Sequence, residues 1–441
     1  MPQSPALRLH AALDLVGAVE ADPRPADAVV SAFLRKRRGL DDSDRAVLLD
    51  RLDGVLRHRA RLGWWLARTG CPETPRCRLL AWVAMSEGLT GDAARRMLAR
   101  GPDRDAGLSP REDAMLRALH GQPPSDAAMP EDLRLEVPDW AAAPLRARFG
   151  PDYATEMAAM LDPAALDLRV NTERTTRDAM LHALSEARLQ PAPMTLAPHG
   201  IRLAARVSLT RVAPLRSGDV EIQDEGSQLV ALLVGAGPGD RVVDFCAGAG
   251  GKTLALGAQM RNRGHITACD VSEGRLARCA ARVRKAGLGN VQTRRLTSET
   301  DPWVKRHKGG YDRVLVDAPC SGTGTWRRNP DARWRSGKGD GLETLTALQA
   351  RILASAARLV RPGGRLVYAT CSLLGQENED QVARFLEAHP GFRILPVDQV
   401  APDSVPEGSG PYLSLTPARH GTDGFFAAVM IRDTASDRPT T

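Results

Sequence analysis

The stretch that most constrains the fold of this chain is Arg241-Val-Val-Asp-Phe-Cys-Ala-Gly-Ala-Gly-Gly-Lys-Thr253. Apolar residues at Val242, Val243 and Phe245 predict a short buried strand, and a helical pattern follows over residues 254–260. Strand, glycine-rich turn and helix together make a nucleotide-binding βα unit, because glycine lets the backbone approach a ligand and a helix start offers free N–H groups. An α/β domain with a ligand loop at this turn is therefore expected.

Several types of turn are compatible with parts of this pattern. A phosphate-binding P-loop requires a glycine at the position of Cys246. A dinucleotide site requires Gly-x-Gly-x-x-Gly, and after Gly248 and Gly250 its third glycine would fall at Thr253. The S-adenosylmethionine loop of a Rossmann-like methyltransferase remains, beside a tight strand-to-helix turn that binds nothing.

Length and composition indicate a globular protein of about two or three domains. The chain has 441 residues, of which 43% are hydrophobic and 26% charged. No apolar run approaches the roughly 18 residues of a membrane span, and Arg8, Asp14 and Glu20 interrupt any secretory signal at the start. Seven cysteines without metal-ligand spacing predict free thiols, no metal and a cytoplasmic location.

Positive charge is concentrated in residues 275–338, which hold 16 Lys and Arg against 5 Asp and Glu, although the whole chain is only +7. Such a segment predicts a track for a nucleic-acid backbone, with Arg327 and Arg328 among its contacts. A solvated helix face is the alternative explanation.

Three regions precede the short tail of the chain. Residues 1–137 are expected to be helical, since Leu48, Leu52, Val55 and Leu56 recur at helical spacing, and basic clusters leave RNA docking open. Residues 138–222 alternate helices with short strands and predict a small α+β unit. Residues 223–433 predict the catalytic domain, and residues 434–441 a disordered tail.

The third region repeats strands and helices. Strands are expected at residues 264–270, 291–296, 312–317, 364–370 and 424–431, and helices at residues 224–234, 275–286 and 343–360. This alternation predicts a mostly parallel sheet with ligands at the carboxyl ends of its strands. Asp270 ends one strand, where a carboxylate can accept both ribose hydroxyls of a nucleoside; an Asp that only solubilises a loop is the alternative.

Two further strand ends carry cysteines, in Asp317-Ala-Pro-Cys-Ser-Gly-Thr-Gly324 and Ala369-Thr-Cys-Ser372. Because parallel strands end at one edge of the sheet, Cys320 and Cys371 are expected to converge. A thiolate is well suited to adding to an electron-poor ring carbon. A buried free cysteine is more often a small hydrophobe, which is expected for Cys246, Cys269 and Cys279.

The glycine loop and both cysteine motifs together resemble the RsmB/Nop/Sun family of RNA cytosine-5 methyltransferases. The resemblance runs from about residue 138 to residue 432, and the helical N-terminal segment is similar to the NusB-like domain of the bacterial ribosomal-RNA members. Four supporting stretches are Leu168-Arg-Val-Asn-Thr172, Ile222-Gln-Asp-Glu-Gly-Ser-Gln228, Arg328-Asn-Pro-Asp-Ala-Arg-Trp334 and Asp423-Gly-Phe-Phe426.

The resemblance implies a role for each matching residue. Cys371 matches the nucleophile that adds to carbon 6 of the target cytosine, Cys320 the second cysteine that resolves the adduct, and Asp317 the acid at the pyrimidine edge. The implied contacts with S-adenosylmethionine are Cys246, Ala247, Gly248, Ala249, Gly250, Gly251, Lys252, Asp270 and Asp317.

The chain departs from the family pattern at two places. Ala249 stands where the loop usually has proline, which predicts a looser turn without loss of function. The acid that usually follows the third strand falls near Thr297 or Ser298, so the adenine contact is the least defined.

The sequence thus predicts a Rossmann-like methyltransferase domain preceded by a small α+β unit and an all-α domain. Its expected activity is methyl transfer from S-adenosylmethionine to carbon 5 of a cytosine in ribosomal RNA, by a monomer that needs no metal or membrane. A single-stranded or flipped base is expected, because a stacked base cannot reach the cleft. A non-catalytic ribosome assembly factor, the same chemistry on tRNA and a nicotinamide dehydrogenase are the alternatives.

Overall fold

The computed structural model describes residues 3–100, 107–203, 212–335 and 341–434, so the predicted tail lies outside it except for Thr434. The chain forms two compact units. The first comprises Met1–Leu161 and Asn329–Gly337, and the second comprises Asp162–Arg328 and Lys338–Thr441.

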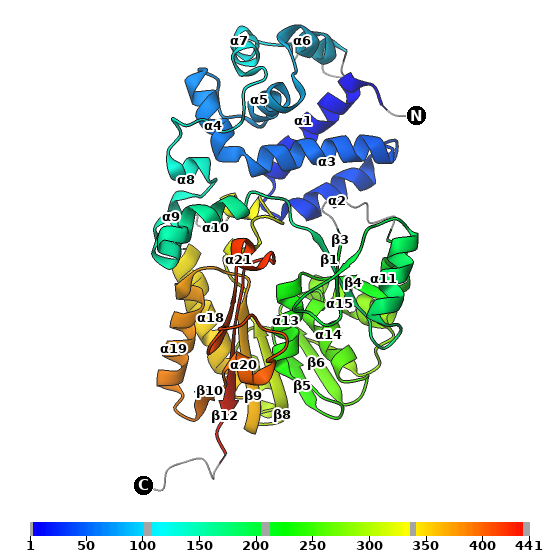
Figure 1. Ribbon diagram of the computed structural model, residues 1–441, viewed down its shortest axis with the longest axis vertical. Helices are drawn as coiled ribbons and strands as arrows, with labels where there is room; N and C mark the ends of the chain where they lie inside the picture. Colours follow the sequence, from blue (N-terminus) through cyan, green and yellow to red (C-terminus); the bar gives the residue numbers. More distant parts are fainter. Residues whose placement is uncertain (1–2, 101–106, 204–211, 336–340, 435–441) are drawn as a thin grey trace. The chain divides into compact units, whose positions relative to one another are not determined.

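The first unit is helical, as the sequence predicts (Figure 1). Its helices are α1 (Pro5–Ala21), α2 (Ala26–Lys36), α3 (Asp42–Arg57), α4 (Arg59–Arg68), α5 (Pro75–Glu87), α6 (Gly91–Ala99), α7 (Pro110–Leu119), α8 (Glu131–Arg134), α9 (Asp139–Phe149), α10 (Tyr153–Ala159) and α17 (Ala332–Arg335), with a 3₁₀ turn η1 (Gly150–Asp152). Helix α3 begins with a capping box: the Asp41 side chain accepts the N–H of Asp44, and the Asp44 side chain accepts the N–H of Asp41.

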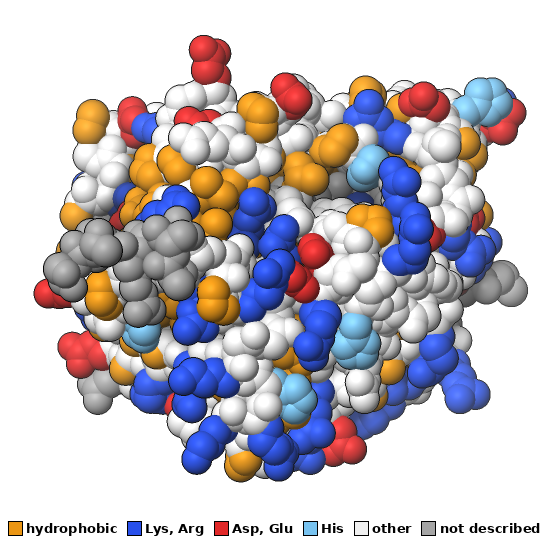
Figure 2. Space-filling model, turned by 90° about the horizontal axis from the view of Figure 1, so that it is seen from below, with side chains coloured by type: hydrophobic (Ala, Val, Ile, Leu, Met, Phe, Trp, Pro, Cys, Tyr) orange, Lys and Arg blue, Asp and Glu red, His pale blue; other side chains and the backbone are white. Residues whose placement is uncertain are grey.

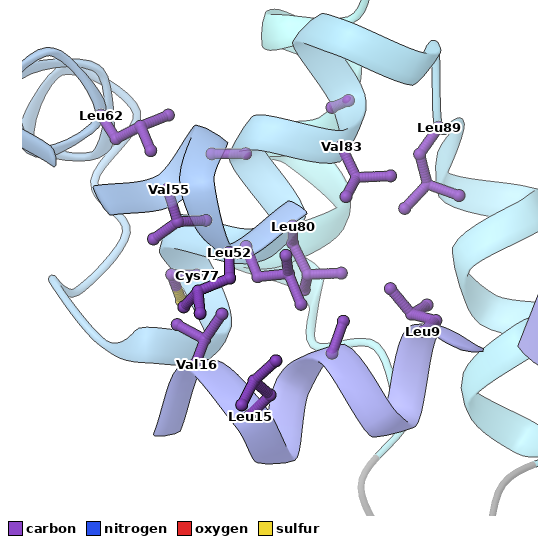
Figure 3. Packing of buried hydrophobic residues seen from close by; sticks show 14 of the residues in the cluster. Leu9, Leu15, Val16, Leu52, Val55, Leu62, Cys77, Leu80, Val83 and Leu89 are labelled. Carbon is purple, nitrogen blue, oxygen red and sulfur yellow. The ribbon is translucent and has the colours of Figure 1, made fainter. Parts of the chain in front are cut away.

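Apolar stripes on these helices meet in one core. Figure 3 shows Leu15 and Val16 of α1 facing Leu52 and Val55 of α3 and Leu80 of α5. Each of these five side chains is buried. Burial of such side chains contributes roughly 1.5–3 kcal/mol each relative to exposure, more than helix propensity supplies.

A short segment from the last third of the sequence completes the first unit. Arg333 of α17 is buried and donates to the carbonyls of Glu136 and Met160. Burial raises the pKa of the Glu136 carboxyl to about 7 and lowers the pKa of the Arg333 guanidinium to about 9. Residues 329–337 thus belong by packing to a unit that is far from them in sequence.

The second unit begins with a small antiparallel sheet in the order β2-β3-β1-β4. Its strands are β1 (Leu166–Val170), β2 (Ala192–Pro193), β3 (Gly200–Leu203) and β4 (Val220–Ile222), with helices α11 (Arg177–Glu186) and α12 (Ala213–Ser217). Leu184 of α11 packs in one cluster with Leu168 of β1 and Ile201 of β3. The α+β character predicted for residues 138–222 is confirmed for the described residues from 162 onward, whereas the residues before them form α9, η1 and α10 of the helical unit.

A larger sheet follows in the order β10-β12-β9-β8-β5-β6-β7, with β11 paired to β12. Its strands are β5 (Arg241–Asp244), β6 (His265–Asp270), β7 (Val291–Arg295), β8 (Tyr311–Asp317), β9 (Val360–Thr370), β10 (Phe392–Ile394), β11 (Tyr412–Leu415) and β12 (Phe425–Arg432). Strands β5 to β9 pair in parallel, and β10, β11 and β12 pair antiparallel.

Helices cover both faces of this sheet (Figure 1). The surrounding elements are α13 (Glu225–Val234), α14 (Gly251–Gln259), α15 (Glu273–Ala286), α16 (Pro302–Arg306), α18 (Gly341–Ala357), α19 (Glu379–Ala388), α20 (Val397–Val400) and α21 (Pro417–His420), with 3₁₀ turns η3 (Thr323–Thr325) and η4 (Gly375–Glu377). On β8, Val314 and Val316 pack toward α18 and α19, whereas Leu315 packs toward α13 and α14. This alternation follows from the two-residue period of a strand.

The predicted Rossmann-like class with a mostly parallel sheet is confirmed. Two neighbouring boundaries differ: α18 ends at Ala357 rather than near residue 360, and β9 begins at Val360 rather than at residue 364, because Val360 already pairs with Tyr311. Among the described helices, none has both the length and the apolar composition needed to cross a membrane.

Candidate active site

A cavity of about 840 Å³ opens at the carboxyl ends of β5, β6 and β8. Its wall includes eight of the residues expected to contact the cofactor: Cys246, Ala247, Gly248, Ala249, Gly251, Lys252, Asp270 and Asp317. Further wall residues come from loops, from the start of β12 and from the middle of α15 and α18, among them Gln223, Asp224, Arg278, Ser298, Leu348 and Phe425. The strand ends therefore build one concave site, as a parallel sheet requires.

The glycine loop is held from two neighbouring elements. Asp270, at the end of β6, accepts the N–H of Gly248 (2.9 Å) and the N–H of Ser272 (2.7 Å). Arg282 of α15 donates to the carbonyl of Ala249 (2.8 Å) and pairs with Glu221 (2.9 Å). The turn that lacks the family's proline is therefore fixed by hydrogen bonds from outside the loop.

Gly250 is the one predicted loop contact that does not line the cavity. It has φ +85°, and a Cβ there would lie 2.5 Å from Sγ of Cys279 and 3.2 Å from Leu254. Glycine at this position is required by the backbone conformation and by the packing of α15, rather than by the approach of a ligand.

The loop fits S-adenosylmethionine in shape and chemistry. Gly248 has φ +55° and nothing within 4 Å of a built Cβ, so the backbone there faces open space. Helix α14 starts at Gly251 without a side-chain cap, which leaves N–H groups for the amino-acid carboxylate of the cofactor. Asp270 is buried at the wall and retains acceptor capacity for ribose hydroxyls.

The segment expected to contact the adenine follows β7. Ser298 and Glu299 line the cavity, whereas Thr297 does not. The N–H and hydroxyl of Thr297 both donate to Asp301 (2.9 Å each), and Glu299 pairs with Arg351 (2.7 Å). Of the two positions considered from sequence, Ser298 is the one that faces the cavity.

An ion pair joins the loop helix to the first cysteine motif. Nζ of Lys252 lies 2.7 Å from Oδ2 of Asp317, and this amine also lies over the ring of Phe425 (5.4 Å to the centroid). Burial acts to lower the pKa of Lys252, but the negative charges of Asp317 and Cys371 outweigh it and raise that pKa. Lys252 is therefore a cation fixed beside Asp317 at the cavity wall.

The two cysteines meet as expected. Their Sγ atoms are 3.4 Å apart, although the residues lie in loops 51 positions apart in the chain. Both are half-buried, and neither lines the cavity, although Asp317 and Pro319 do. The hydrogen bond to Cys371, with burial and the charge of Glu377, raises the pKa of the Cys320 thiol well above its usual range.

A close backbone contact fixes the end of the first cysteine motif. A Cβ on Gly324 would lie 2.2 Å from the carbonyl oxygen of Gly424, whose N–H donates to Gly324 (2.7 Å). The N–H of Gly324 in turn donates to the carbonyl of Cys371 (2.9 Å). Only glycine fits at this contact, which brings two of the recognised motifs together.

All seven cysteines are free thiols, and burial raises the pKa of Cys246, Cys269 and Cys279, with Cys279 at about 11. Such thiols are small hydrophobes, although Cys246 also faces the cavity. Within the part of the chain that the structure describes, no group of three or more His, Cys, Asp or Glu is arranged to hold a metal ion.

Arg327 and Arg328, expected to bind phosphate, are used internally. Arg327 is buried and pairs with Asp423 (2.7 Å), and Arg328 pairs with Asp423 (2.8 Å) and Asp224 (3.1 Å). Burial, with the charge of Asp423, raises the pKa of Asp224 to about 7. The sequence did not reveal this network, although Asp224 and Asp423 lie in the motif stretches quoted above.

Comparison with known proteins identifies the family. Profiles of the 16S rRNA methyltransferase RsmB/F family and of the ferredoxin-like domain of RsmF/B-like methyltransferases match residues 231–431 and 137–210. The chain is 30% identical over 415 residues to ribosomal RNA small subunit methyltransferase B of Sodalis glossinidius, covering 90% of this chain and 91% of that protein.

Solved structures share the fold. The crystal structure of PH0851 has a TM-score of 0.81 at 24% identity and covers 97% of this chain and 99% of that chain. NSun6 from Pyrococcus horikoshii, crystallised with SFG, has a TM-score of 0.58 at 20% identity, covering 67% and 98%. The profile matches and the full-length relative, together with the glycine loop and the paired cysteines, show that the chain belongs to the RsmB/F family of methyltransferases, whose cofactor is S-adenosylmethionine.

Proposed function

We propose that this protein methylates carbon 5 of a cytosine in ribosomal RNA through a covalent bond between Cys371 and carbon 6. The observation that carries the proposal is the 3.4 Å separation of the Cys320 and Cys371 sulfur atoms beside the cavity. A second supporting feature is the Lys252–Asp317 pair at the same edge of the sheet. Two thiols next to a fixed cation and a carboxylate suit nucleophilic addition to a pyrimidine ring.

The cofactor would be held by the glycine loop, with Gly248 and Gly251 at the amino-acid end and Asp270 at the ribose. When bound, S-adenosylmethionine supplies a methyl group carried on a positively charged sulfur. The chain contributes the shape of the wall and the acceptors, while Leu348 and Phe425 exclude water from part of the cavity.

The reacting base would be activated by residues of the second unit. The Cys371 thiolate forms a bond with carbon 6, and the electron pair displaced onto the ring makes carbon 5 nucleophilic. Asp317 faces the pyrimidine edge, and Lys252 offsets the negative charge that develops there. After methyl transfer, loss of the carbon-5 proton to a base restores the double bond, and the Cys371 sulfur leaves as a thiolate.

We infer the class of RNA substrate from the family and from the positive charge of residues 275–338. The relative from Sodalis glossinidius is named for the ribosomal RNA of the small subunit, and we extend that substrate class, and a cytoplasmic location, to this protein. Bisulfite sequencing of RNA from cells with and without the gene tests both the base and the RNA. Loss of one protected cytosine in small-subunit RNA is expected, whereas an unchanged ribosomal RNA profile would contradict the proposal.

Substitution of each cysteine tests the covalent step. Cys371→Ala should form no bond with RNA and make no product, because carbon 6 is no longer attacked. Cys320→Ala should add to cytosine but fail to resolve the adduct, so that a complex resistant to denaturation accumulates. The measurement is a denaturing gel after incubation with RNA and cofactor, with Cys279→Ala, whose sulfur packs behind the glycine loop, as the control.

The opposite pattern would reverse the roles. A shifted band from Cys371→Ala together with none from Cys320→Ala would make Cys320 the nucleophile. Methyl transfer that survives in Cys371→Ala would exclude the covalent route through that residue.

A further inference from the structure

A buried carboxyl group lies beneath the two cysteine loops. Glu377, the last residue of η4, is fully buried. Its Oε1 accepts the N–H of Ser321 (2.8 Å) and Nε2 of Gln349 (2.9 Å), and its Oε2 accepts the hydroxyls of Ser321 and Ser372. Among the ion pairs of the described residues, none involves Glu377, so only neutral donors hold this carboxylate.

Two of the partners of Glu377 are the residues next to the two thiols. Ser321 follows Cys320, and Ser372 follows Cys371. One carboxylate therefore joins the loop after β8 to the loop after β9. The neighbouring Asn378 adds to this link, because it accepts from Thr370 and donates to the carbonyl of Ser372 (2.9 Å).

Burial of the charged Glu377 side chain lowers the stability of the folded protein, which a neutral residue at this position would avoid. Burying a carboxylate without a cation costs several kcal/mol, even when neutral hydrogen bonds compensate in part. A glutamine would keep one acceptor oxygen and most of the link between the loops. The charge itself thus requires an explanation beyond joining two loops.

The charges around the thiol pair are asymmetric. Glu377 accepts both the N–H and the hydroxyl of Ser321, next to Cys320, but only the hydroxyl of Ser372, next to Cys371, and its charge is one of the causes that raise the pKa of Cys320. The nearby cation is Lys252, which pairs with Asp317 and whose pKa is raised in part by Cys371. A negative charge that contacts mainly the Cys320 loop, together with a cation near Cys371, favours the state in which the proton shared by the two thiols stays on Cys320.

We propose that Glu377 is a positioning residue that holds the two thiols in contact and keeps the shared proton on Cys320, so that the thiolate resides on Cys371. This deepens the proposed function, on which it rests, by explaining why two neighbouring cysteines take different roles. Other titratable groups facing Cys320 are Tyr368 and Cys371 of the β9 segment. None of these carries a positive charge.

The test measures the reactivity of each thiol in the full-length protein without RNA or cofactor. Limiting iodoacetamide is added at pH values from 6 to 10, and mass spectrometry quantifies modification of Cys320 and Cys371 separately. In the native protein, Cys371 should become reactive at lower pH than Cys320. Glu377→Gln should shift the profile of Cys320 to lower pH and reduce the preference for Cys371 at neutral pH by about tenfold or more, corresponding to one pH unit.

A matched control and a second variant complete the design. Glu387→Gln makes the same chemical change on an exposed position of α19 and should leave both profiles unchanged. Glu377→Asp keeps the charge on a shorter side chain and should retain the preference for Cys371. This variant keeps the proposal testable if Glu377→Gln does not fold. An unchanged preference in folded Glu377→Gln, or equal reactivity of the two thiols in Glu377→Asp, would overturn the proposal.

Methyl transfer is then measured separately on the same variants. Glu377→Gln should lower kcat about tenfold with little change in KM for the cofactor. A shifted alkylation profile in a protein that does not methylate cytosine would contradict the proposed function and leave the role of Glu377 intact. Cytosine methylation by a protein whose alkylation profile does not shift in Glu377→Gln would contradict the role of Glu377 and leave the proposed function intact.

Discussion

Two glycines of the cofactor loop, separated only by Ala249, have different structural roles. Gly248 has open space where a side chain would be, and it lines the cavity. Gly250 faces Cys279 of α15 at a distance that no Cβ tolerates. A glycine-rich motif therefore combines residues that admit a ligand with residues that admit a neighbouring helix.

Substitution of Gly250 should destabilise the protein before it affects the ligand. Gly250→Ala is expected to cost about 2–4 kcal/mol of the free energy of unfolding, from the left-handed backbone and the overlap with Cys279. Adding Cys279→Ala should restore part of that loss, because it removes the sulfur 2.5 Å away. Urea denaturation measures both effects.

Gly248→Ala is the matched control for this prediction. It carries the backbone cost of about 1–2 kcal/mol but no overlap, and its methyl group points into the cavity. Affinity for S-adenosylmethionine, measured by calorimetry, should fall more than stability does. Equal stability losses in the two variants, with no rescue by Cys279→Ala, would contradict the separate roles.

At the scale of an element, β5 ends in a buried acid that burial makes hard to ionise. Asp244 accepts a hydrogen bond from Thr253 (2.7 Å), while its other oxygen has no partner among the described residues. Burial raises the pKa of Asp244 to about 7. The carboxyl is thus protonated in the folded protein over a pH range in which it ionises in the unfolded chain.

The sign of the pH effect follows from that difference. Because the folded state binds the extra proton, the contribution of Asp244 to stability falls as pH rises from about 4 to about 7. Asp244→Asn removes this dependence and should be more stable than the native protein by about 2–4 kcal/mol at pH 8, with little difference at pH 4. Urea denaturation across this range, with exposed Asp178→Asn as the control, gives the comparison; parallel curves for Asp244→Asn and the native protein would refute it.

At the scale of the whole molecule, the basic segment divides into internal and external charges. Arg282, Arg327, Arg328 and Arg333 make ion pairs or buried hydrogen bonds. Arg275 and Arg278 of α15 are exposed and line the cavity, so they are placed to meet the RNA backbone. Figure 2 shows that one face of the molecule carries many Lys and Arg side chains and fewer Asp and Glu.

RNA affinity should therefore depend on salt through the exposed arginines. Arg275→Gln with Arg278→Gln should reduce the slope of log affinity against log salt by roughly 1–2, since each phosphate contact contributes about 0.7 for a single strand. Filter binding between 50 and 300 mM salt measures the slope. The control is the pair Arg358→Gln and Arg384→Gln. Arg358 follows α18 and Arg384 lies on α19; both are exposed, and neither lines the cavity. An equal reduction of the salt slope in that pair would assign the effect to net charge alone.

The sequence by itself determined the elements, their order and the side chains of the reactive centre. Hydrophobic periodicity and glycine turns are local, so β5, α14, β6 and β8 fall where predicted, and a parallel sheet necessarily brings their carboxyl ends to one edge. Cys320, Cys371, Asp317 and Asp270 could be placed together on this basis.

The tertiary structure alone decided which neighbours those residues meet. Gly250 is explained by Cys279, Arg328 by Asp224 and Asp423, and Glu377 by two serines from separate loops. Residues 329–337 belong to the helical unit although the surrounding sequence belongs to the sheet unit. These contacts join positions far apart in the chain, and their energies come from burial and charge pairing, which no local pattern encodes.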